Sequence, residues 1–510
     1  MSLMNKKYRK KLFLHLDGIV IIPIINSFLN KGILDYIYKH EKNNITDLKT
    51  HFQINEGYGN ITLRLLKSIG IIKNRNQKNK NLILQIINLK NTIYKISNLY
   101  KYYINLEKIF NDKSKNENFI KLLQDTHKEL SYKKKNIQKE LYYYLEGAFL
   151  GPLLSNLGFL QIIKENQIQH KKICNKKTYL IINNILSENG FLNEKNEYTD
   201  KGNFFFNRLA SYGVTVSYLN TFAKIDDLLF NENYFMWERD ENGHEIHVNR
   251  TMNVWGSGGA HKFYFKKIDE IIIDIFNQEI DKQPKGIIDV GCGDGSFLIH
   301  LYNIIMTKTS RKKHIKDFPL KVIGVDLNKA ARTETEKNLK INKIDHIVID
   351  GNISEPSTIN QILNEKFNEN LNDYLNTRTF LDHNRIYSKS KKDYKSNIKT
   401  TGAFSYKGEL ITSNEIVNNL IEHFKNWKPF ISKYGIIILE LHTLNPKLIS
   451  ENRGKTLSCA YDATHGFSDQ YLIEYDTFLK CLEFANFKLK NKKTLFPNKN
   501  IPTISINYLK

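Results

Sequence analysis

The sequence predicts an α/β protein in which a seven-stranded, mostly parallel sheet fills the C-terminal part and follows a mainly α-helical N-terminal region. In residues 246–510, short apolar runs alternate with amphipathic helical patterns, and the series ends in strands that we expect to be antiparallel. In residues 1–130 and 131–245, apolar residues recur mostly at helical spacing. These three ranges are the predicted domains.

The composition is that of a globular protein, with 41% hydrophobic and 25% charged residues in a chain of 510. The four cysteines lie far apart and form no CxxC pair, which argues against a disulfide framework or a structural zinc site and favours a cytoplasmic location. Asp17 and Pro23 interrupt the N-terminal apolar run, and the stretch 19–25 is too short to span a bilayer. We expect a buried helix there and no membrane partner.

The net charge of +23 raises the hypothesis of a nucleic-acid partner. However, lysine, asparagine and isoleucine are abundant along the whole chain, as in a compositional bias, and arginine is sparse. Arginine is the residue that binds phosphates and bases through paired hydrogen bonds. We therefore expect no nucleic-acid partner.

The N-terminal half contains an approximate internal repeat. One copy opens with LDGIVIIP at residue 16 and the other with LEGAFLGP at residue 145, so an acid–glycine pair precedes a proline by the same spacing in both. Each copy later has a helix that ends at a glycine, Gly70 or Gly190, and the second copy continues into a short alternating hairpin. This order is typical of a winged helix.

A winged helix either reads DNA or serves as a dimerisation and substrate-lid module. Arg64 is the only arginine in the two expected recognition helices, 61–68 and 178–187. The second interpretation is therefore favoured, and it implies a homodimer.

The strongest local pattern surrounds Gly291, Gly293 and Gly295, which follow an apolar strand at 287–290 and precede an amphipathic helix. Glycines there allow a tight turn and close approach of a ligand. Asp289 and Asp294 would repel a pyrophosphate but suit a ligand with a cationic amine and a sulfonium. The pattern resembles the first motif of class I methyltransferases, which bind S-adenosylmethionine in a Rossmann-like domain.

The resemblance implies further cofactor contacts at the ends of the next two strands. Asp326 would accept the ribose hydroxyls, and Asp350 would face the adenine N6. Strands at 373–378 and 435–444 and a closing hairpin complete the expected order. The implied cofactor residues are Asp289, Gly291, Gly293, Asp294, Gly295, Asp326, Leu327, Asp350, Gly351 and Asn352.

A glycine-rich segment at 256–259 precedes the first strand of this region. We expect it to be a loop that lies close to a ligand, with Trp255, Tyr264 and Phe265 as candidates to cover the cofactor.

Three clusters near the ends of the fourth and fifth strands are candidates for the acceptor pocket. His465 lies in a glycine-flanked stretch rich in Thr, Ser and Asp, so we expect a loop and propose this residue as a general base. Glu440 or Asp382 would orient it or another histidine, with His383 the second candidate. His442 is equally consistent with a core histidine.

An alternative interpretation is a mononuclear metal site. Asp382, His383, His465 and Gln470 are ligand types of non-haem metal centres. A transition metal there could bind an enolisable β-dicarbonyl and acidify its carbon.

The strings VNRTMNVWGSGGAH, TRTFLDHNR and THGFSDQYL resemble methyltransferases of bacterial polyketide pathways, particularly of the trans-acyltransferase kind. They are also similar to the iron-dependent C-methyltransferase of a polyketide loading module. The resemblance implies a polyketide substrate, free or tethered to an acyl carrier protein. O-methylation of a hydroxyl with a histidine base is the leading interpretation. Metal-dependent C-methylation of a carrier-bound acyl group is the first alternative, and RNA or DNA methylation is the second.

Overall fold

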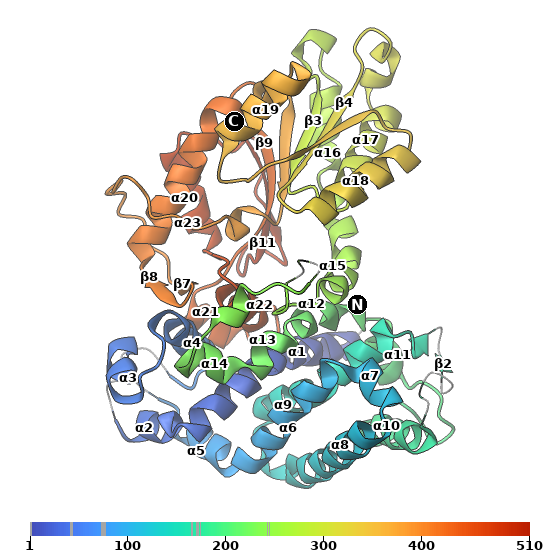
Figure 1. Ribbon diagram of the computed structural model, residues 1–510, viewed down its shortest axis with the longest axis vertical. Helices are drawn as coiled ribbons and strands as arrows, with labels where there is room; N and C mark the ends of the chain where they lie inside the picture. The colour runs from blue at the N-terminus through green and yellow to red at the C-terminus, as the bar shows by residue number, and fades with distance from the viewer. Residues whose placement is uncertain are drawn as a thin grey trace. The chain divides into compact units, whose positions relative to one another are not determined.

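The computed structural model describes residues 3–40, 44–72, 78–164, 167–169, 173, 175–241, 243 and 245–510 (Figure 1). Contacts between Cα atoms divide the chain into two compact units. The first unit comprises 1–259, 403–410 and 445–469, and the second comprises 260–402, 411–444 and 470–510. The first unit therefore draws on segments from both halves of the sequence.

The first unit is mainly helical, and its elements are α1 (Leu3–Asn30), α2 (Ile33–Lys39), α3 (Ile45–Phe52), α4 (Glu56–Ser68), α5 (Lys80–Asn88), α6 (Lys90–Tyr103), α7 (Leu106–Asn111), α8 (Lys113–Lys133), α9 (Lys139–Phe159), β1 (Ile163–Lys164), β2 (Gln167–Ile168), α10 (Lys176–Glu188), α11 (Asp200–Phe206), α12 (Ala210–Ser217), α13 (Leu219–Ala223), α14 (Ile225–Phe230), β7 (Phe404–Tyr406), α21 (Pro446–Glu451) and α22 (Ser458–Gly466). Two elements continue from the first unit into the second, α15 (Arg250–Phe265) and β8 (Glu409–Ile411).

The second unit contains α16 (Asp269–Phe276), β3 (Gly286–Val290), α17 (Ser296–Lys308), β4 (Lys321–Asp326), α18 (Lys329–Ile341), β5 (His346–Asp350), α19 (Pro356–Phe367), β6 (Leu375–Thr379), α20 (Ser413–Trp427), β9 (Ile436–Leu441), α23 (Tyr475–Phe484), β10 (Thr494–Phe496) and β11 (Ile504–Leu509).

Its seven strands form one sheet in the order β10-β11-β9-β6-β3-β4-β5. The five strands from β9 to β5 are parallel, and β11 runs antiparallel to both of its neighbours, β9 and β10. In Figure 1, α16, α17 and α18 lie on one side of this sheet, and α19, α20 and α23 lie on the other. The predicted α/β class, with a mostly parallel sheet of seven strands, is confirmed.

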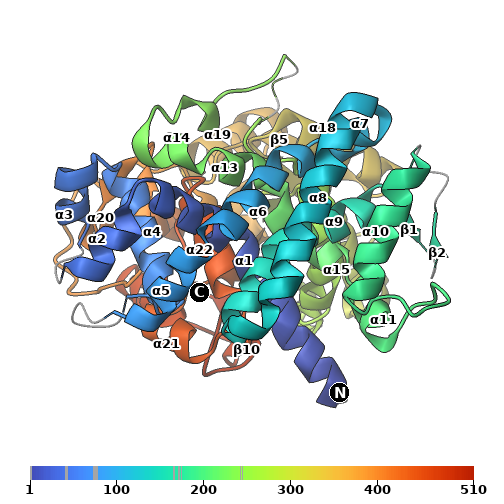
Figure 2. The same ribbon diagram turned by 90° about the horizontal axis from the view of Figure 1, so that it is seen from below.

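The long helices α1 and α9 cross at unusually short distance in the first unit, and α6 packs against both (Figure 2). A Cβ atom on Gly18 would lie 2.2 Å from the carbonyl oxygen of Tyr144, and one on Gly147 would lie 2.2 Å from the Cα of His15. Each glycine therefore faces the backbone of the other helix. The repeat seen in the sequence thus marks the two sides of one helix–helix crossing.

Buried polar groups accompany this crossing. His15 Nε2 lies 3.1 Å from Glu146 Oε2, and its Nδ1 lies 2.8 Å from the hydroxyl of Tyr212. Lys11 Nζ lies 2.7 Å from Glu146 Oε1. Burial lowers the pKa of His15 to about 4, so the imidazole is neutral at neutral pH and Lys11 supplies the countercharge for Glu146.

By length and composition, α1 could cross a membrane, but 89% of its most apolar window is buried inside the protein. This agrees with the expected buried helix.

Both copies of the repeat also show the expected glycine after a helix. Gly70 follows α4 with φ +80°, and Gly190 follows α10 with φ +72°. The expected hairpin of the second copy is reduced to a single antiparallel bridge between Leu192 and Tyr198. The residues between Leu192 and Tyr198 lie in the described part of the chain, and they add no further strand pairing to this bridge.

The helix α22 belongs to the first unit because two side chains from the N-terminal helices hold it. Asp17 Oδ1 accepts the backbone N–H of Ala460 at 2.9 Å, in the first turn of α22. Arg64 Nε lies 3.2 Å from Asp462 Oδ2, and both side chains are buried. Burial raises the pKa of Asp17 to about 8, against an ordinary value of 3.8.

We expect Gly18→Ala to lower the free energy of unfolding by about 3 kcal/mol, because the new methyl group must push the backbone of α9 away. Urea unfolding followed by circular dichroism would measure it. The control is Gly258→Ala in α15, where a Cβ meets nothing within 4 Å. That variant should be neutral or more stable by up to about 1 kcal/mol. Equal losses in the two variants would contradict the close crossing.

We expect Asp17→Asn to remove a pH dependence of stability. Because the pKa of Asp17 is raised in the folded state, its contribution is present below pH 4 and is lost as the pH rises towards 8. Asparagine keeps the hydrogen-bond acceptor without this titration. The difference between the unfolding midpoint of the variant and that of the wild type should therefore be more favourable to the variant at pH 8 than at pH 5. A constant difference between the two proteins would refute the assignment.

Candidate active site

The glycine loop after β3 adopts a conformation that side chains disfavour. Gly291, Gly293 and Gly295 have φ of +81°, +57° and +76°. A Cβ on Gly293 would meet nothing within 4 Å, so this loop presents open space at its tip. Asp294 Oδ1 accepts the N–H of Ser296 at 3.0 Å and so caps the first turn of α17.

Carboxylates stand at the ends of three neighbouring strands: Asp289 in β3, Asp326 in β4 and Asp350 in β5. Asp289 is 1% exposed and accepts a hydrogen bond from Thr377 at 2.8 Å, while its Oδ2 atom has no partner among the described residues. Burial raises its pKa well above the ordinary value. A cationic ligand near this acid would give the Oδ2 atom of Asp289 the partner that it lacks.

Asp326 is tied to the glycine loop. Its Oδ2 atom accepts the N–H of Gly293 at 3.0 Å, and its Oδ1 atom accepts the N–H of Asn328 at 2.8 Å. Burial raises its pKa as well. This acid therefore orders the loop and lies directly beside it.

The remaining predicted cofactor residues form the rim of this region. Asp350 has 63% of its side chain exposed and pairs with Arg332 Nη1 at 3.0 Å, a partner that sequence reasoning missed. Leu327 is exposed, Gly351 packs against Val325, and Asn352 Oδ1 accepts the N–H of Ser354. The open glycine tip and the three acids fit a compact ligand that carries positive charge.

The turn after β6 lies against the glycine loop and carries a histidine. The side chain of Leu381 comes within 2.7 Å of the place where a Cβ of Gly291 would be. His383 follows in the short 3-10 turn η8 (Asp382–Asn384), and its Nδ1 atom lies 2.5 Å from Glu440 Oε1. Glu440 Oε2 also accepts the backbone N–H of His383 at 3.1 Å. The structure thus pairs two of the three predicted catalytic residues.

This pair is buried and is positioned by the sheet. His383 is 5% exposed and Glu440 is 2% exposed. Thr379 in β6 is in register with Leu439 in β9, which places Glu440 beside the turn that follows β6. His442, two residues after Glu440, packs edge-on against Tyr475 and Phe478, and its Nε2 atom lies 2.7 Å from the hydroxyl of Ser505. It is a core histidine.

Asp382 belongs to a different network. Its Oδ1 atom accepts hydrogen bonds from Arg378 Nη1 at 2.6 Å and His423 Nε2 at 2.9 Å. Arg378 stacks on Trp427 at 3.9 Å. Burial lowers the pKa of His423 to about 4. His423 lies on the buried face of α20 among apolar residues, so the sequence pattern there does not predict that it has a polar partner.

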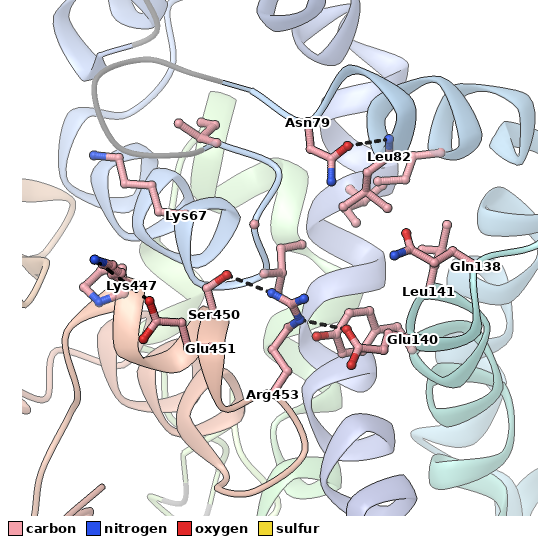
Figure 3. A pocket seen from close by; sticks show the side chains of 17 residues that line it. Lys67, Asn79, Leu82, Gln138, Glu140, Leu141, Lys447, Ser450, Glu451 and Arg453 are labelled. Atoms are coloured by element: carbon pink, nitrogen blue, oxygen red, sulfur yellow. Dashed lines mark hydrogen bonds and ion pairs between the residues drawn. The ribbon is translucent and has the colours of Figure 1, made fainter. Parts of the chain in front are cut away.

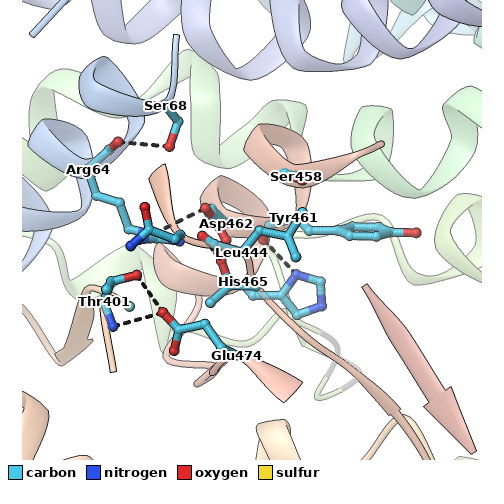
Figure 4. A network of polar contacts seen from close by, with 12 residues as sticks. Arg64, Ser68, Thr401, Leu444, Ser458, Tyr461, Asp462, His465 and Glu474 are labelled. Carbon is cyan, nitrogen blue, oxygen red and sulfur yellow. Dashed lines mark hydrogen bonds and ion pairs between the residues drawn. The ribbon is translucent and has the colours of Figure 1, made fainter. Parts of the chain in front are cut away.

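His465 lies in the first unit, and the expected loop is wrong there. The residue belongs to helix α22, is 8% exposed, and donates from Nδ1 to the carbonyl of Tyr461 at 2.8 Å (Figure 4). The segment is helical because Asp17 caps its first turn and Arg64 pairs with Asp462. Both contacts come from residues hundreds of positions away.

The glycine-rich segment 256–259 is also not a loop, because it lies within helix α15. The backbones of Gly256 and Gly213 approach closely, and a Cβ on Gly213 would lie 2.7 Å from the Cα of Gly256. These glycines permit helix packing. Trp255 packs edge-on against Phe159, and Phe265 packs against Phe297 in the core of the sheet.

His261 in the same helix was not singled out from the sequence. Its ring stacks on Phe380 at 5.2 Å, in the turn that leads to His383. Burial lowers its pKa, and the charge of Asp294 in the glycine loop opposes that effect. In the sequence, His261 follows the glycines of a predicted loop, and nothing in that pattern indicates its contact with Phe380.

Within the described ranges, no group of three or more His, Cys, Asp or Glu side chains is arranged to hold a metal ion. Of the four residues considered as ligands, Asp382, His383 and Gln470 belong to the second unit and His465 to the first.

Comparison with known proteins gives matches along much of the chain. The family described as AprA MT2-like domain matches residues 245–507, the AprA N-terminal domain matches 8–74, and the AprA winged helix domain matches 146–232. No curated protein matches the chain at a significant level.

Among solved structures, the comparison matches the citrinin polyketide synthase CMeT domain, with 11% identity, 65% of this chain and 77% of that chain covered, and a TM-score of 0.37. The mitomycin 7-O-methyltransferase MmcR has 7% identity, coverage of 74% and 99%, and a TM-score of 0.41. The CurJ carbon methyltransferase has 10% identity, coverage of 76% and 98%, and a TM-score of 0.35. From its match over 245–507, the chain belongs to the AprA MT2-like family and is an S-adenosylmethionine-dependent methyltransferase with an N-terminal winged helix region.

Proposed function

We propose that this enzyme methylates a hydroxyl group of a polyketide, with His383 as general base and Glu440 as the residue that orients it. The observation that carries the proposal is the buried His383–Glu440 pair, 2.5 Å apart, in the turn whose Leu381 touches the glycine loop. A carboxylate that accepts the proton of one ring nitrogen fixes the tautomer of the imidazole, so the other nitrogen is the basic atom of the neutral ring.

The cofactor site in this proposal is the glycine loop and the strand ends beside it. When bound, S-adenosylmethionine supplies an electrophilic methyl group. Gly293 leaves room at the loop tip, and the acids favour a ligand with an ammonium and a sulfonium group. The residues assigned to this role are Asp289, Gly291, Gly293, Asp294, Gly295, Asp326, Leu327, Asp350, Gly351 and Asn352.

The acceptor hydroxyl must lose its proton as the methyl group is transferred. In the proposal, Glu440 accepts the Nδ1 proton of His383, so that Nε2 is the atom that takes the proton from the substrate. The buried position of the pair strengthens this hydrogen bond and excludes competing water. Glu440 is a positioning residue, and His383 is the proposed catalytic residue.

His465 is the alternative base, because donation from its Nδ1 atom to the carbonyl of Tyr461 also leaves Nε2 as the acceptor. The metal-dependent alternative, C-methylation of an acyl group on a carrier protein, would require Asp382 as a ligand. Both bonds that Asp382 accepts, from Arg378 and His423, fall on its Oδ1 atom, and its Oδ2 atom has no partner among the described residues.

The polyketide substrate is proposed from the resemblance of VNRTMNVWGSGGAH and THGFSDQYL to polyketide methyltransferases. An acyl carrier protein is the proposed donor of that substrate, and the net charge of +23 would steer a usually acidic partner towards the enzyme. We propose 246–510 as the catalytic domain and the winged-helix-like parts, 1–130 and 131–245, as lid and homodimer modules.

We expect His383→Ala to lower kcat by about 10²- to 10⁴-fold while the Kd for S-adenosylmethionine stays unchanged, because the base acts on the acceptor alone. Glu440→Gln should lower kcat in the same direction, since the amide no longer holds the productive tautomer. Single-turnover rates and calorimetry would measure the two effects. The matched control is His442→Gln, a buried histidine outside the pair. A large loss in His465→Ala with none in His383→Ala would move the base to His465.

We expect product analysis with ¹³C-methyl-labelled cofactor to show a methoxy group on a hydroxylated acyl carrier substrate. NMR and mass spectrometry of the released product distinguish it from a C-methyl group. Elemental analysis of the purified protein accompanies this test. A near-stoichiometric transition metal that His383→Ala removes, together with a C-methyl product, would overturn O-methylation in favour of the metal-dependent alternative.

A further inference from the structure

Four charged side chains are buried around His383 in the second unit. Arg378 lies in β6, Asp382 and Arg385 lie in and directly after the turn η8, and Glu440 lies in β9. None of the four is more than 2% exposed. Buried charges are unfavourable unless they compensate one another, so the balance of charge in this set constrains the state of the site.

The first cation of the set is paired directly. Arg378 Nη1 donates to Asp382 Oδ1 at 2.6 Å, and His423 Nε2 lies 2.9 Å from the same oxygen. Burial alone would raise the pKa of Asp382, but the charge of Arg378 and the hydrogen bond of His423 hold that pKa well below its ordinary value. Asp382 is therefore ionised and cancels the charge of Arg378.

The second cation, Arg385, is held by neutral acceptors. Its Nε atom donates to Asn419 Oδ1 at 2.7 Å, and its Nη1 atom donates to the backbone carbonyl of Asp382 at 2.8 Å. The guanidinium carbon lies 5.6 Å from the ring centre of Tyr471. In the ranges that the structure describes, Arg385 forms no ion pair with a carboxylate.

Arg453, which lines a cavity of the first unit, gives a contrast (Figure 3). Its Nε atom donates to Glu140 Oε2 at 2.9 Å, and its Nη1 atom donates to Ser450 Oγ at 2.8 Å. This partly buried arginine thus meets a carboxylate directly, whereas the more deeply buried Arg385 does not. The charge of Arg385 must be compensated from a longer distance.

Glu440 is the carboxylate that matches this charge. It accepts hydrogen bonds from the backbone N–H groups of His383 and Leu441 and lies against the ring of His383. All of these partners are uncharged as long as the imidazole is neutral. Burial lowers the pKa of Arg385, and the charges of Asp382 and Glu440 are among those that oppose this effect. Arg385 and Glu440 therefore act on each other without a direct bond.

The other titratable groups around the pair are uncharged at neutral pH. Burial lowers the pKa of His423 in α20 to about 4 and that of His442 in β9 to about 3, and it raises the pKa of Cys481 in α23 to about 12. Tyr471 is a phenol and keeps its proton at this pH. Two cations and two carboxylates remain, so the buried set is neutral when His383 is neutral as well.

We propose that Arg385 is the countercharge of Glu440 and keeps His383 uncharged, which is the state in which the imidazole can take a proton from the acceptor. Without this cation, one negative charge would be left over, and a proton on His383 would cancel it. Arg385 is a positioning residue, because it acts through Glu440. The inference rests on the proposed role of His383 as general base.

The test follows the protonation of His383 by NMR of the full-length protein labelled with ¹³C-histidine, in which His383→Gln identifies the signal. Arg385→Gln removes the charge and keeps a hydrogen-bond donor. We expect the midpoint of His383 protonation to lie about one pH unit higher in this variant than in the wild type. The pH at which kcat falls on the acidic side should move upward by the same amount.

Asn419→Asp creates the same imbalance with Arg385 in place. The two side chains have nearly the same shape, and the added carboxylate would take Arg385 Nε as its own partner. We expect an upward shift of the midpoint of similar size. If Arg385→Gln does not fold, this variant decides alone.

Arg311→Gln is the matched control. Arg311 is as deeply buried as Arg385, but it bonds the carbonyl groups of Lys285 and Pro319, just before β3 and β4 begin and thus at the opposite end of the strands from His383. This variant should leave the midpoint unchanged.

The proposal is overturned if the midpoint is unchanged in either folded variant, Arg385→Gln or Asn419→Asp, or if Arg311→Gln moves it by as much. The NMR measurement needs no substrate, so it is independent of the proposed reaction. A raised midpoint without a matching change in the pH dependence of kcat would support the countercharge and refute His383 as the base.

Discussion

The first unit depends on the close crossing of α1 and α9. Gly18 and Gly147 each take the place where any larger residue would strike the facing backbone. At this separation the neighbouring side chains are close together, so the polar ones must satisfy one another. The carboxylate of the buried Glu146 contacts both the buried His15 and the partly buried Lys11. The surrounding apolar helices then pack on a fixed centre.

The sequence allowed the second unit to be predicted closely, because the signals there are local. Short apolar strands, a G-x-G-x-G turn and acids at strand ends each follow from short-range rules, and the alternation of strands with helices predicts a mostly parallel sheet. Glu440 and His383 were recognised as residue types near the strand ends. Their pairing depends on the register of β6 and β9, which a single sequence does not contain.

Prediction failed where contacts between distant residues decide the local structure. The stretch around His465 has the glycine and small polar residues of a loop, yet Asp17 and Arg64 stabilise it as a helix. Likewise, the segment 256–259 is helical, and its Gly256 lies against the backbone of Gly213. His423 and His261 were missed because their partners, Asp382 and Phe380, come from other elements.

The bond from Asp17 to Ala460 joins residues 443 positions apart. During synthesis on the ribosome, α1 leaves the exit tunnel long before the segment that it caps, so the first unit cannot be completed until almost the whole chain has emerged. Until then the surface that will receive α22 is uncovered, and Arg64 has not yet met Asp462. A shortened chain that stops at residue 259 would preserve this immature state, and the N-terminal unit is therefore not separable by a simple cut in the chain.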